Sequence, residues 1–107
     1  SVVAVYDRAS LIALPVDLRA KYAHHLYSII SKDCRVLLLT LNYPQSQMSG
    51  PPFAVNEDEV VSLFSKSKGF ECQQLQCFND IKNEPKFLRA GVDFIEKATY
   101  CLRKIGE

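Results

Sequence analysis

The sequence predicts an α/β fold in which the buried strands of a parallel sheet are flanked by helices. Two apolar runs without alternation, at residues 1–6 and 34–43, are typical of strands that are buried on both faces. The segment between them carries apolar residues at helical spacing. Strand, helix and strand in this order form a βαβ unit, whose crossover is right-handed.

The first strand ends at two adjacent charged residues, Asp7 and Arg8. Ligands of open α/β sheets bind outside the carboxyl ends of the strands, so these side chains are candidates for a functional site. The alternative is that Arg8 only forms an ion pair, with Asp7 or with another carboxylate nearby. Because the chain begins directly on a strand of the core type, we expect that further sequence precedes it in the intact protein.

The first helix is expected to begin at Pro15, with Asp17 close to its positively polarised amino end. Arg19 and Lys21 lie on the side of this helix that we expect to face solvent. A stripe of residues at helical spacing is predicted to face the core instead: Leu18, Tyr22, Leu26 and Ile29.

A loop rich in proline, glycine, serine and glutamine follows the second strand, at residues 44–53. It lies at the same edge of the sheet as the charged pair, where long loops often bind ligands or act as lids. Pro51 and Pro52 fix the backbone just before Phe53. Phe53 is therefore either presented to a ligand or packed beneath the loop, and the sequence favours neither.

A second helix is predicted after this loop. Asn56 is its expected N-cap, Glu59 completes a capping box, and Gly69 is suited to a carboxyl-terminal cap. The buried face of this helix is expected to consist of Val60, Val61, Leu63 and Phe64.

A third strand is expected at residues 70–78, and a slip of its alternation between Cys72 and Leu75 indicates a bulge or an exposed edge. Residues 79–90 form a charged connection. The last segment, residues 92–105, fits either a strand or a helical stripe. Its aromatic and β-branched residues favour a strand that pairs antiparallel with the third.

The composition is that of a globular protein. The chain has 107 residues, of which 48% are hydrophobic, and it is interpreted as a single unit over residues 1–107. A net charge of +1 gives no indication of a nucleic-acid partner. Neither a membrane-spanning run nor a signal peptide is visible, so a cytoplasmic protein without a membrane partner is expected.

No metal site and no catalytic nucleophile is predicted. His24 and His25 are adjacent on the first helix, so their side chains point in different directions. Core packing is expected, rather than disulfide or redox chemistry, for the four cysteines, which are Cys34, Cys72, Cys77 and Cys101. Glycine-rich phosphate motifs and a Gly-x-Ser-x-Gly motif are absent from the sequence.

Three motifs together resemble one known family. Residues 6–15, Tyr-Asp-Arg-Ala-Ser-Leu-Ile-Ala-Leu-Pro, closely resemble the fourth-strand motif of the thiopurine S-methyltransferase family. Residues 41–44, Leu-Asn-Tyr-Pro, and residues 50–55, Gly-Pro-Pro-Phe-Ala-Val, resemble the next strand of that family and its loop. Order and spacing agree over nearly the whole chain, with the bacterial members most similar, but the resemblance covers only the carboxyl-terminal half of the family's domain.

The resemblance implies a class I methyltransferase that uses S-adenosylmethionine. The implied fold is part of a Rossmann-like sheet, with parallel strands, a terminal antiparallel strand and flanking helices. The implied methyl acceptor is a small-molecule thiol or a related selenium or tellurium compound. The family's glycine-rich cofactor loop and ribose-binding acid have no counterpart in this sequence, so we expect methyl transfer to need the missing amino-terminal half.

The resemblance also assigns residues. It implies that Asp7 and Arg8 contact the cofactor, and that Arg8, Phe53 and Lys86 contact the acceptor. Lys86 stands near a position where some members have arginine, so it keeps the charge but lacks the bidentate fork. Arg8 stays protonated and is not a base; a guanidinium instead favours the anionic form of an acidic thiol.

An alternative of a different class is a truncated, non-catalytic module derived from this fold. A free edge on the first strand would recruit another chain. The expected partner is therefore either the missing amino-terminal half or a second copy that associates through this edge.

Overall fold

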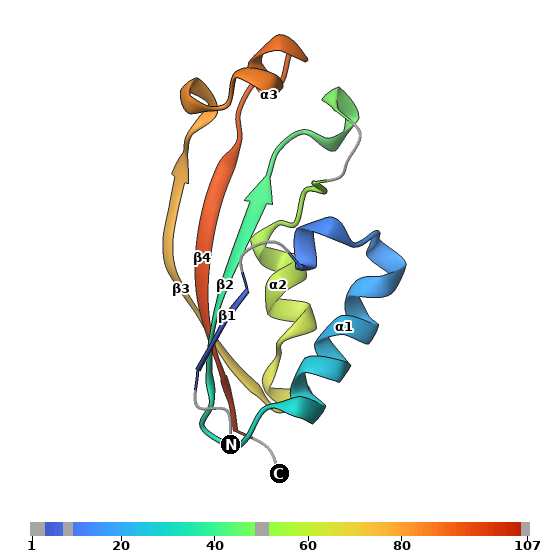
Figure 1. The fold of residues 1–107 in the computed structure, drawn as a ribbon, viewed down its shortest axis with the longest axis vertical. Helices are drawn as coiled ribbons and strands as arrows, with labels where there is room; N and C mark the ends of the chain where they lie inside the picture. Colours follow the sequence, from blue (N-terminus) through green and yellow to red (C-terminus); the bar gives the residue numbers. More distant parts are fainter. Residues whose placement is uncertain (1–3, 8–9, 49–51, 106–107) are drawn as a thin grey trace.

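The computed structural model describes residues 4–7, 10–48 and 52–105. Four strands form one sheet in the order β1-β2-β4-β3 (Figure 1). Strand β1 (Ala4–Asp7) pairs parallel with β2 (Arg35–Asn42). Strand β4 (Glu96–Lys104) lies antiparallel between β2 and β3 (Phe70–Asn79). The predicted terminal antiparallel strand is thus confirmed, and it is inserted beside the parallel pair.

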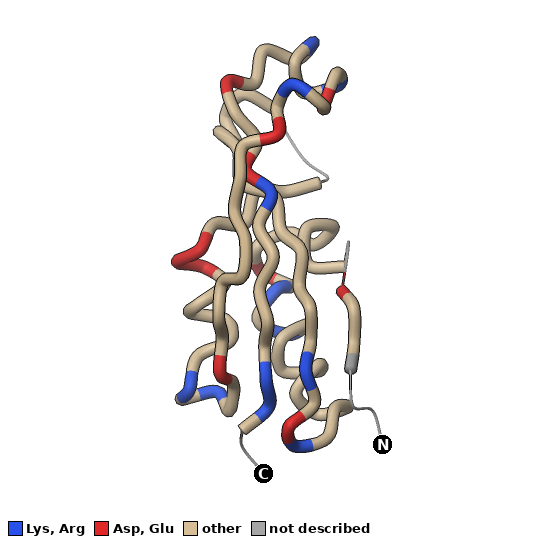
Figure 2. Tube along the Cα trace, turned by 90° about the vertical axis from the view of Figure 1, so that its left-hand side faces the viewer, with Lys and Arg blue, Asp and Glu red and all other residues tan. Residues whose placement is uncertain are grey.

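Both longer helices cover the same face of the sheet. Helix α1 (Val16–Ile29) and helix α2 (Glu57–Leu63) lie behind the strands when the sheet faces the viewer (Figure 2). The main core lies between these helices and the sheet; its members include Leu26, Val36, Leu38, Val60, Phe64, Tyr100 and Leu102. Helix α3 (Pro85–Arg89) lies beyond the tips of the central strands (Figure 1).

A second, smaller core lies at the end of the molecule that carries α3. It consists of Tyr43, Phe87, Val92 and Ile95, with Leu41, Met48, Ala54 and Ile81 packed against them. The rings of Tyr43 and Phe87 meet edge to face with their centroids 5.3 Å apart. This outer core joins the loop after β2 to the connection between β3 and β4.

The prediction that the first strand is buried on both faces is wrong for the part of the chain that the structure describes. Tyr6 of β1 is 59% exposed, and its register partner Leu37 on β2 is also exposed. The reason is that α1 and α2 both lie on the opposite side of the sheet from these two side chains. We call the face that carries Tyr6 and Leu37 the open face.

The predicted stripe on α1 is also partly wrong. Leu18 and Ile29 are exposed, whereas Ala23 and Leu26 face the core together with Arg19. The helix is rotated from the predicted orientation because polar side chains on it bind other elements, as described below. A count of apolar residues could not reveal those contacts.

Helix α2 has the predicted N-cap but differs from the prediction in its capping box, its exposed Val61 and its carboxyl end. The Asn56 side chain accepts a hydrogen bond from the Glu59 N–H at 2.9 Å. The Glu59 carboxylate does not complete the capping box but binds α1, and Val61 is exposed rather than buried. The prediction that Gly69 caps the carboxyl end of this helix is wrong: α2 ends at Leu63 with Phe64 as its C-cap, and Gly69, with φ +87°, ends the separate 3-10 turn Lys66–Lys68.

Strand β3 is both bulged and at the sheet edge. Its register against β4 shifts between Gln74 and Gln76, close to the predicted slip. All four cysteines are free: Cys34 is buried, Cys72 and Cys101 are partly buried, and Cys77 is exposed. Core packing is therefore wrong for Cys77, because it lies on the exposed edge strand.

Candidate functional site

The site predicted from the sequence lies at the rim where β1 and β2 end. Asp7, the last residue of β1, is only 4% exposed. Its Oδ1 accepts from the backbone N–H of Ser10 at 3.0 Å, and its Oδ2 accepts from the Tyr22 hydroxyl. Both carboxylate oxygens are thus bound by groups of this chain, which fixes the turn after β1 against α1.

Tyr22 is a stable donor in this arrangement. Burial of the hydroxyl, together with its hydrogen bond to the Asp7 carboxylate, raises the pKa of Tyr22 far above its ordinary value. The hydroxyl therefore stays protonated over the physiological range. Arg8, the residue implied to contact both cofactor and acceptor, lies outside the described residues.

The loop after β2 is held by Tyr43 and Gln45. The Tyr43 hydroxyl donates to the Pro52 carbonyl at 2.5 Å, and it accepts from Gln45 Nε2 at 3.0 Å. The same amide group donates to the Met48 carbonyl at 2.9 Å, while Gln45 Oε1 accepts from the Ala54 N–H at 2.7 Å. The side chain of Gln45 therefore joins both ends of the loop.

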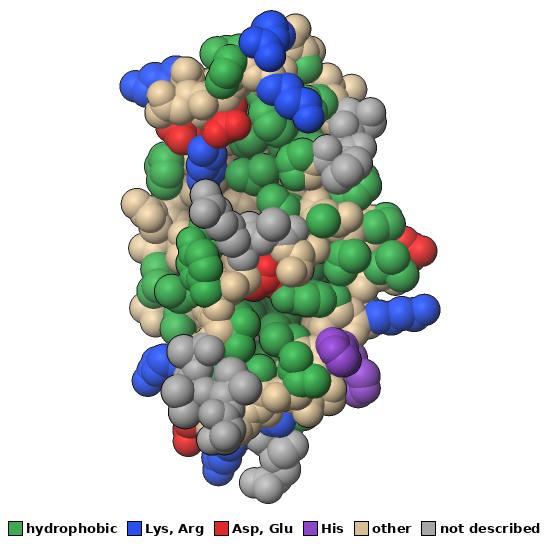
Figure 3. Space-filling view, viewed as in Figure 1, with side chains coloured by type: hydrophobic (Ala, Val, Ile, Leu, Met, Phe, Trp, Pro, Cys, Tyr) green, Lys and Arg blue, Asp and Glu red, His purple; other side chains and the backbone are tan. Residues whose placement is uncertain are grey.

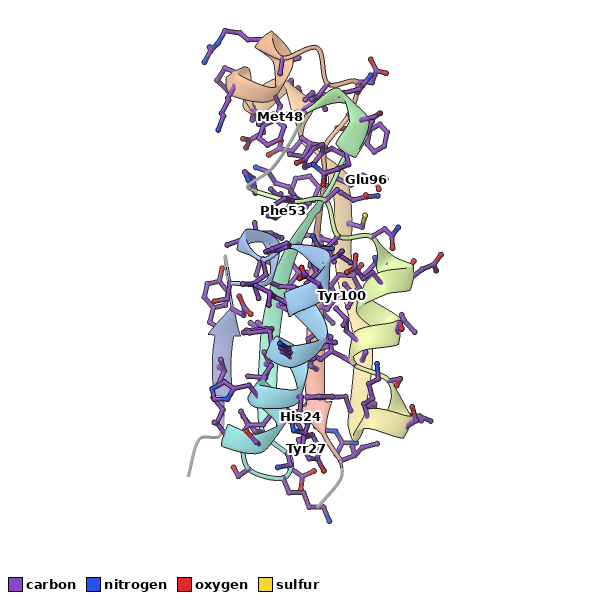
Figure 4. The ribbon with its side chains drawn as sticks, turned by 90° about the vertical axis from the view of Figure 1, so that its right-hand side faces the viewer. His24, Tyr27, Met48, Phe53, Glu96 and Tyr100 are labelled. Atoms are coloured by element: carbon purple, nitrogen blue, oxygen red, sulfur yellow. The ribbon has the colours of Figure 1, made fainter. Side chains whose placement is uncertain are left out.

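Phe53 is partly buried and is fixed from two sides. Its N–H donates to the Ile12 carbonyl at 2.7 Å, which ties the loop to the turn after β1. The guanidinium carbon of Arg19 lies 5.8 Å from the centre of its ring. Figure 4 shows Phe53 just beyond the amino-terminal end of α1. The ring packs on Arg19 and lines a cavity, and its presentation to a ligand stays a prediction.

Arg19 is a buried cation, so the prediction that it faces solvent is wrong. It is 5% exposed, and its Nη1 donates to the two carboxylate oxygens of Glu59 at 2.8 and 2.7 Å. Its Nε donates to the Leu14 carbonyl at 3.0 Å. A basic residue in the first turn of a helix opposes the helix dipole, and this is the one local signal that could have drawn attention to it.

A cavity of about 640 Å³ opens between the amino end of α1 and the loop after β2. Helix α1 and the residue before it, the end of β2 and the loop each contribute to its wall. Its lining residues are Pro15, Val16, Arg19, Asn42, Tyr43, Gln45, Phe53, Ala54 and Asn56. An aromatic ring, an aliphatic wall and a few polar groups are the usual composition of a site for a small organic molecule.

Lys86 lies on α3 and is exposed. Helix α3 is tied to the loop after β2 through the outer core and through Gln47, which donates to Asp93 Oδ2 and accepts from the Asp93 N–H, both at 2.9 Å. Lys and Arg side chains gather at this end of the molecule (Figure 3). The structure therefore places Lys86 on the same outer part as the loop that carries Phe53, but in a separate element.

Two kinds of site find no support in the described part of the chain. No group of three or more His, Cys, Asp or Glu residues there could hold a metal ion. No helix among the described residues is long and apolar enough to cross a membrane.

Comparison with known proteins identifies the family to which this sequence is similar. Residues 1–105 match the family Thiopurine S-methyltransferase (TPMT). The chain is 40% identical over 102 residues to the thiopurine S-methyltransferase of Bordetella pertussis, covering 95% of this chain and 46% of that protein. With the enzyme of the same name from Nitrosospira multiformis it shares 42% identity over 99 residues, 92% of this chain and 44% of the relative.

The fold has a counterpart among solved structures. An arsenic(III) S-adenosylmethionine methyltransferase from Chlamydomonas reinhardtii superposes with a TM-score of 0.69 at 16% identity, over 96% of this chain and 38% of that one. The sheet is thus part of a Rossmann-like methyltransferase fold. This chain spans about half the length of the curated relatives it matches and corresponds to their carboxyl-terminal half. By sequence, it belongs to the thiopurine S-methyltransferase family.

Proposed function

We propose that this chain supplies the carboxyl-terminal half of an S-adenosylmethionine-dependent methyltransferase. The acceptor that we propose is a small thiol, or a related selenium or tellurium compound. The observation that carries this proposal is the family match over residues 1–105, which includes the loop that holds Phe53 at the rim. The cavity beside this loop gives a small organic acceptor a place to bind.

The Asp7 carboxylate is not free to bind the cofactor. Both oxygens of the Asp7 carboxylate are already bound, so we propose that Asp7 orders the turn after β1, and that Arg8 makes the contact with cofactor and acceptor. When bound, S-adenosylmethionine would supply a sulfonium methyl group for transfer to the acceptor sulfur.

The residues of this chain would align the acceptor and exclude water. Phe53 provides an apolar wall, and the hydrogen bonds of Gln45 hold the loop in place before any ligand binds. Lys86, an exposed cation on α3, would favour the anionic form of an approaching thiol.

A complementation assay tests this function. The chain is mixed with the amino-terminal half of the Bordetella pertussis relative, and transfer of a labelled methyl group to 6-mercaptopurine is measured. We expect turnover only in the mixture, and a loss of at least about 100-fold in the mixture with Arg8→Ala, because alignment of the reacting atoms contributes strongly to such rates. Absence of turnover from a mixture that forms a stable complex would refute the proposal.

We also propose that the partner of this chain is a polypeptide equivalent to that amino-terminal half. Strands of parallel sheets are normally covered on both faces, yet the open face exposes Tyr6 and Leu37. Cys101 lies opposite Leu37 on the same face and is partly buried, whereas Cys77 is exposed on the edge strand.

Thiol labelling distinguishes this partner from self-association. Adding the amino-terminal half should slow the labelling of Cys101 several-fold and leave Cys77 labelled as before. Slow labelling of Cys101 in the isolated chain, with no further change on addition of the partner, would indicate that a second copy covers the open face instead.

A further inference from the structure

We propose that Arg19 determines which methyl acceptor binds, by donating a hydrogen bond from Nη2 to an acceptor atom of a planar ring held beside Phe53. The inference rests on the proposed function insofar as the ring is the methyl acceptor. The residue itself was assigned no function by the sequence.

The first step is that Arg19 has donors to spare. A guanidinium carries five N–H donors. Nε and Nη1 are used by the Leu14 carbonyl and the Glu59 carboxylate. Nη2 has no hydrogen-bond partner among the residues that the structure describes. Although the side chain is only 5% exposed, Nη2 is not sealed off from solvent, because the Thr40 hydroxyl is the only fully buried, unpaired side-chain atom among the described residues. Nη2 can therefore donate to a ligand in the cavity that Arg19 lines.

The second step is that the other polar side chains of the cavity wall are uncharged, and that Asn56 among them is an exposed residue whose oxygen caps α2. Arg19 is the only charged residue among the described residues that line the cavity. The amide of Asn42 donates to Glu96 at 3.2 Å, and the amide of Gln45 is used up by the loop. The free edge of the guanidinium therefore gives the cavity its strongest donor.

The third step is that this donor is rigid. The Glu59 carboxylate and the Leu14 carbonyl fix the guanidinium plane, and Phe53 lies 5.8 Å from its carbon. A ligand then loses little free energy in ordering the side chain that binds it. A planar ring against Phe53, with a thione or thiolate sulfur, a carbonyl oxygen or a ring nitrogen toward Nη2, satisfies both groups at once.

The test compares two probes of equal size, thiophenol and toluene, in which a methyl group replaces the thiol and neither ring carries a nitrogen. Binding to the isolated chain is measured by NMR titration of backbone amides. For the unmodified chain we expect thiophenol to bind about tenfold more tightly, as one hydrogen bond to a charged group provides. The shifted amides should include those of Phe53 and Arg19.

Two variants remove the donor in different ways. Arg19→Lys keeps the charge but loses the guanidinium fork. The double variant Arg19→Met with Glu59→Leu replaces both members of the ion pair by apolar side chains, an exchange that buried ion pairs often tolerate. In both, the preference for sulfur should fall below about twofold, while toluene binds as before. Lys21→Met, an exposed cation on the same helix, is the matched control and should keep the full preference.

A purely structural role for Arg19 predicts something else: both probes would weaken equally in folded variants. That result, an undiminished preference, or shifts confined to another surface would overturn the proposal. The outcome is independent of the methyl transfer assay. If the Arg19 variants lose the preference for sulfur but the complemented mixture shows no turnover, the binding site is supported and the proposed function is rejected. If the mixture turns over but the variants keep the preference, the proposed function is supported and the role of Arg19 is rejected.

Discussion

Arg19 and Tyr22 lie on the same side of α1 and bind two different segments of the rim. Tyr22 holds the carboxylate at the end of β1, and Arg19 holds Glu59 of α2 while lying against Phe53. Residues three positions apart on a helix are neighbours, so one turn of α1 positions both segments. One turn of α1 thus links the end of β1 to α2 and to the loop after β2.

Thr40 offers a prediction at this scale. It is buried in β2, and its hydroxyl has no hydrogen-bond partner within the part of the chain that the structure describes. Thr40→Val keeps the shape and removes the unpaired hydroxyl, so the free energy of unfolding should rise by about 1 kcal/mol. Urea unfolding measures it. Thr99→Val, on the open face of β4, is the control and should change stability by less than about 0.5 kcal/mol.

At the scale of elements, two turns use glycine in the left-handed region for different reasons. Gly69 has φ +87°, and a Cβ there would come within 2.3 Å of the Tyr27 ring. Gly91 has φ +83°, but a Cβ there would meet nothing within 4 Å. The first turn needs glycine for its backbone and for space, whereas the second needs it for its backbone alone.

This difference gives a matched pair of substitutions. Gly91→Ala should cost about 1 kcal/mol of unfolding free energy, the price of left-handed backbone. Gly69→Ala should cost about 3 kcal/mol, because the ring of Tyr27 must also move. Equal losses in thermal or urea unfolding would contradict the close packing of α1 against this turn.

An ion cluster joins β4 to the connection before α3. Lys97 Nζ lies 2.9 Å from Asp80 and 2.6 Å from Glu84. The hydrogen bonds from Lys97 and Asn83 lower the pKa of Asp80, and those to Glu84 and Asp80 raise the pKa of Lys97.

The signs of these shifts set the pH dependence. A lowered carboxyl pKa stabilises the fold fully above the ordinary value of 3.8, and this stabilisation disappears as the pH falls through the folded-state pKa. A raised lysine pKa stabilises fully below 10.5, and this is lost as the pH rises through the folded-state value. We expect Lys97→Met to reduce both the loss of stability at low pH and the loss at high pH, as measured by urea unfolding across the pH range. An unchanged pH dependence would show that the cluster does not contribute to stability.

At the scale of the whole molecule, the sheet has an open face and β1 lies at its edge. An apolar strand edge recruits other chains. In the absence of the amino-terminal half we therefore expect the chain to self-associate, with a molar mass by light scattering that increases with concentration. Leu37→Lys on the open face should reduce the association. A single monomer peak at every concentration would refute this expectation.

The sequence predicts elements better than it predicts orientations. Strand β4 and the N-cap at Asn56 depend on local spacing and local backbone preference, and the structure confirms them. Which side of α1 faces the core depends on residues that are distant in the sequence. Glu59, which binds Arg19, is 40 positions away, and no local pattern contains such a contact. The family and its fold were predictable from three short motifs. The implied contacts of Asp7, Arg8, Phe53 and Lys86 with ligands stay predictions.

The separation of the outer core from the main core has a consequence for motion. The outer core holds both the loop after β2 and α3, while α1, α2 and the centre of the sheet belong to the main core. Clusters that share few contacts open independently, with different free energies. Amide hydrogen exchange should therefore reveal the rim as a less protected unit that opens without unfolding the rest, so that ligands can enter and leave while the scaffold beneath stays intact.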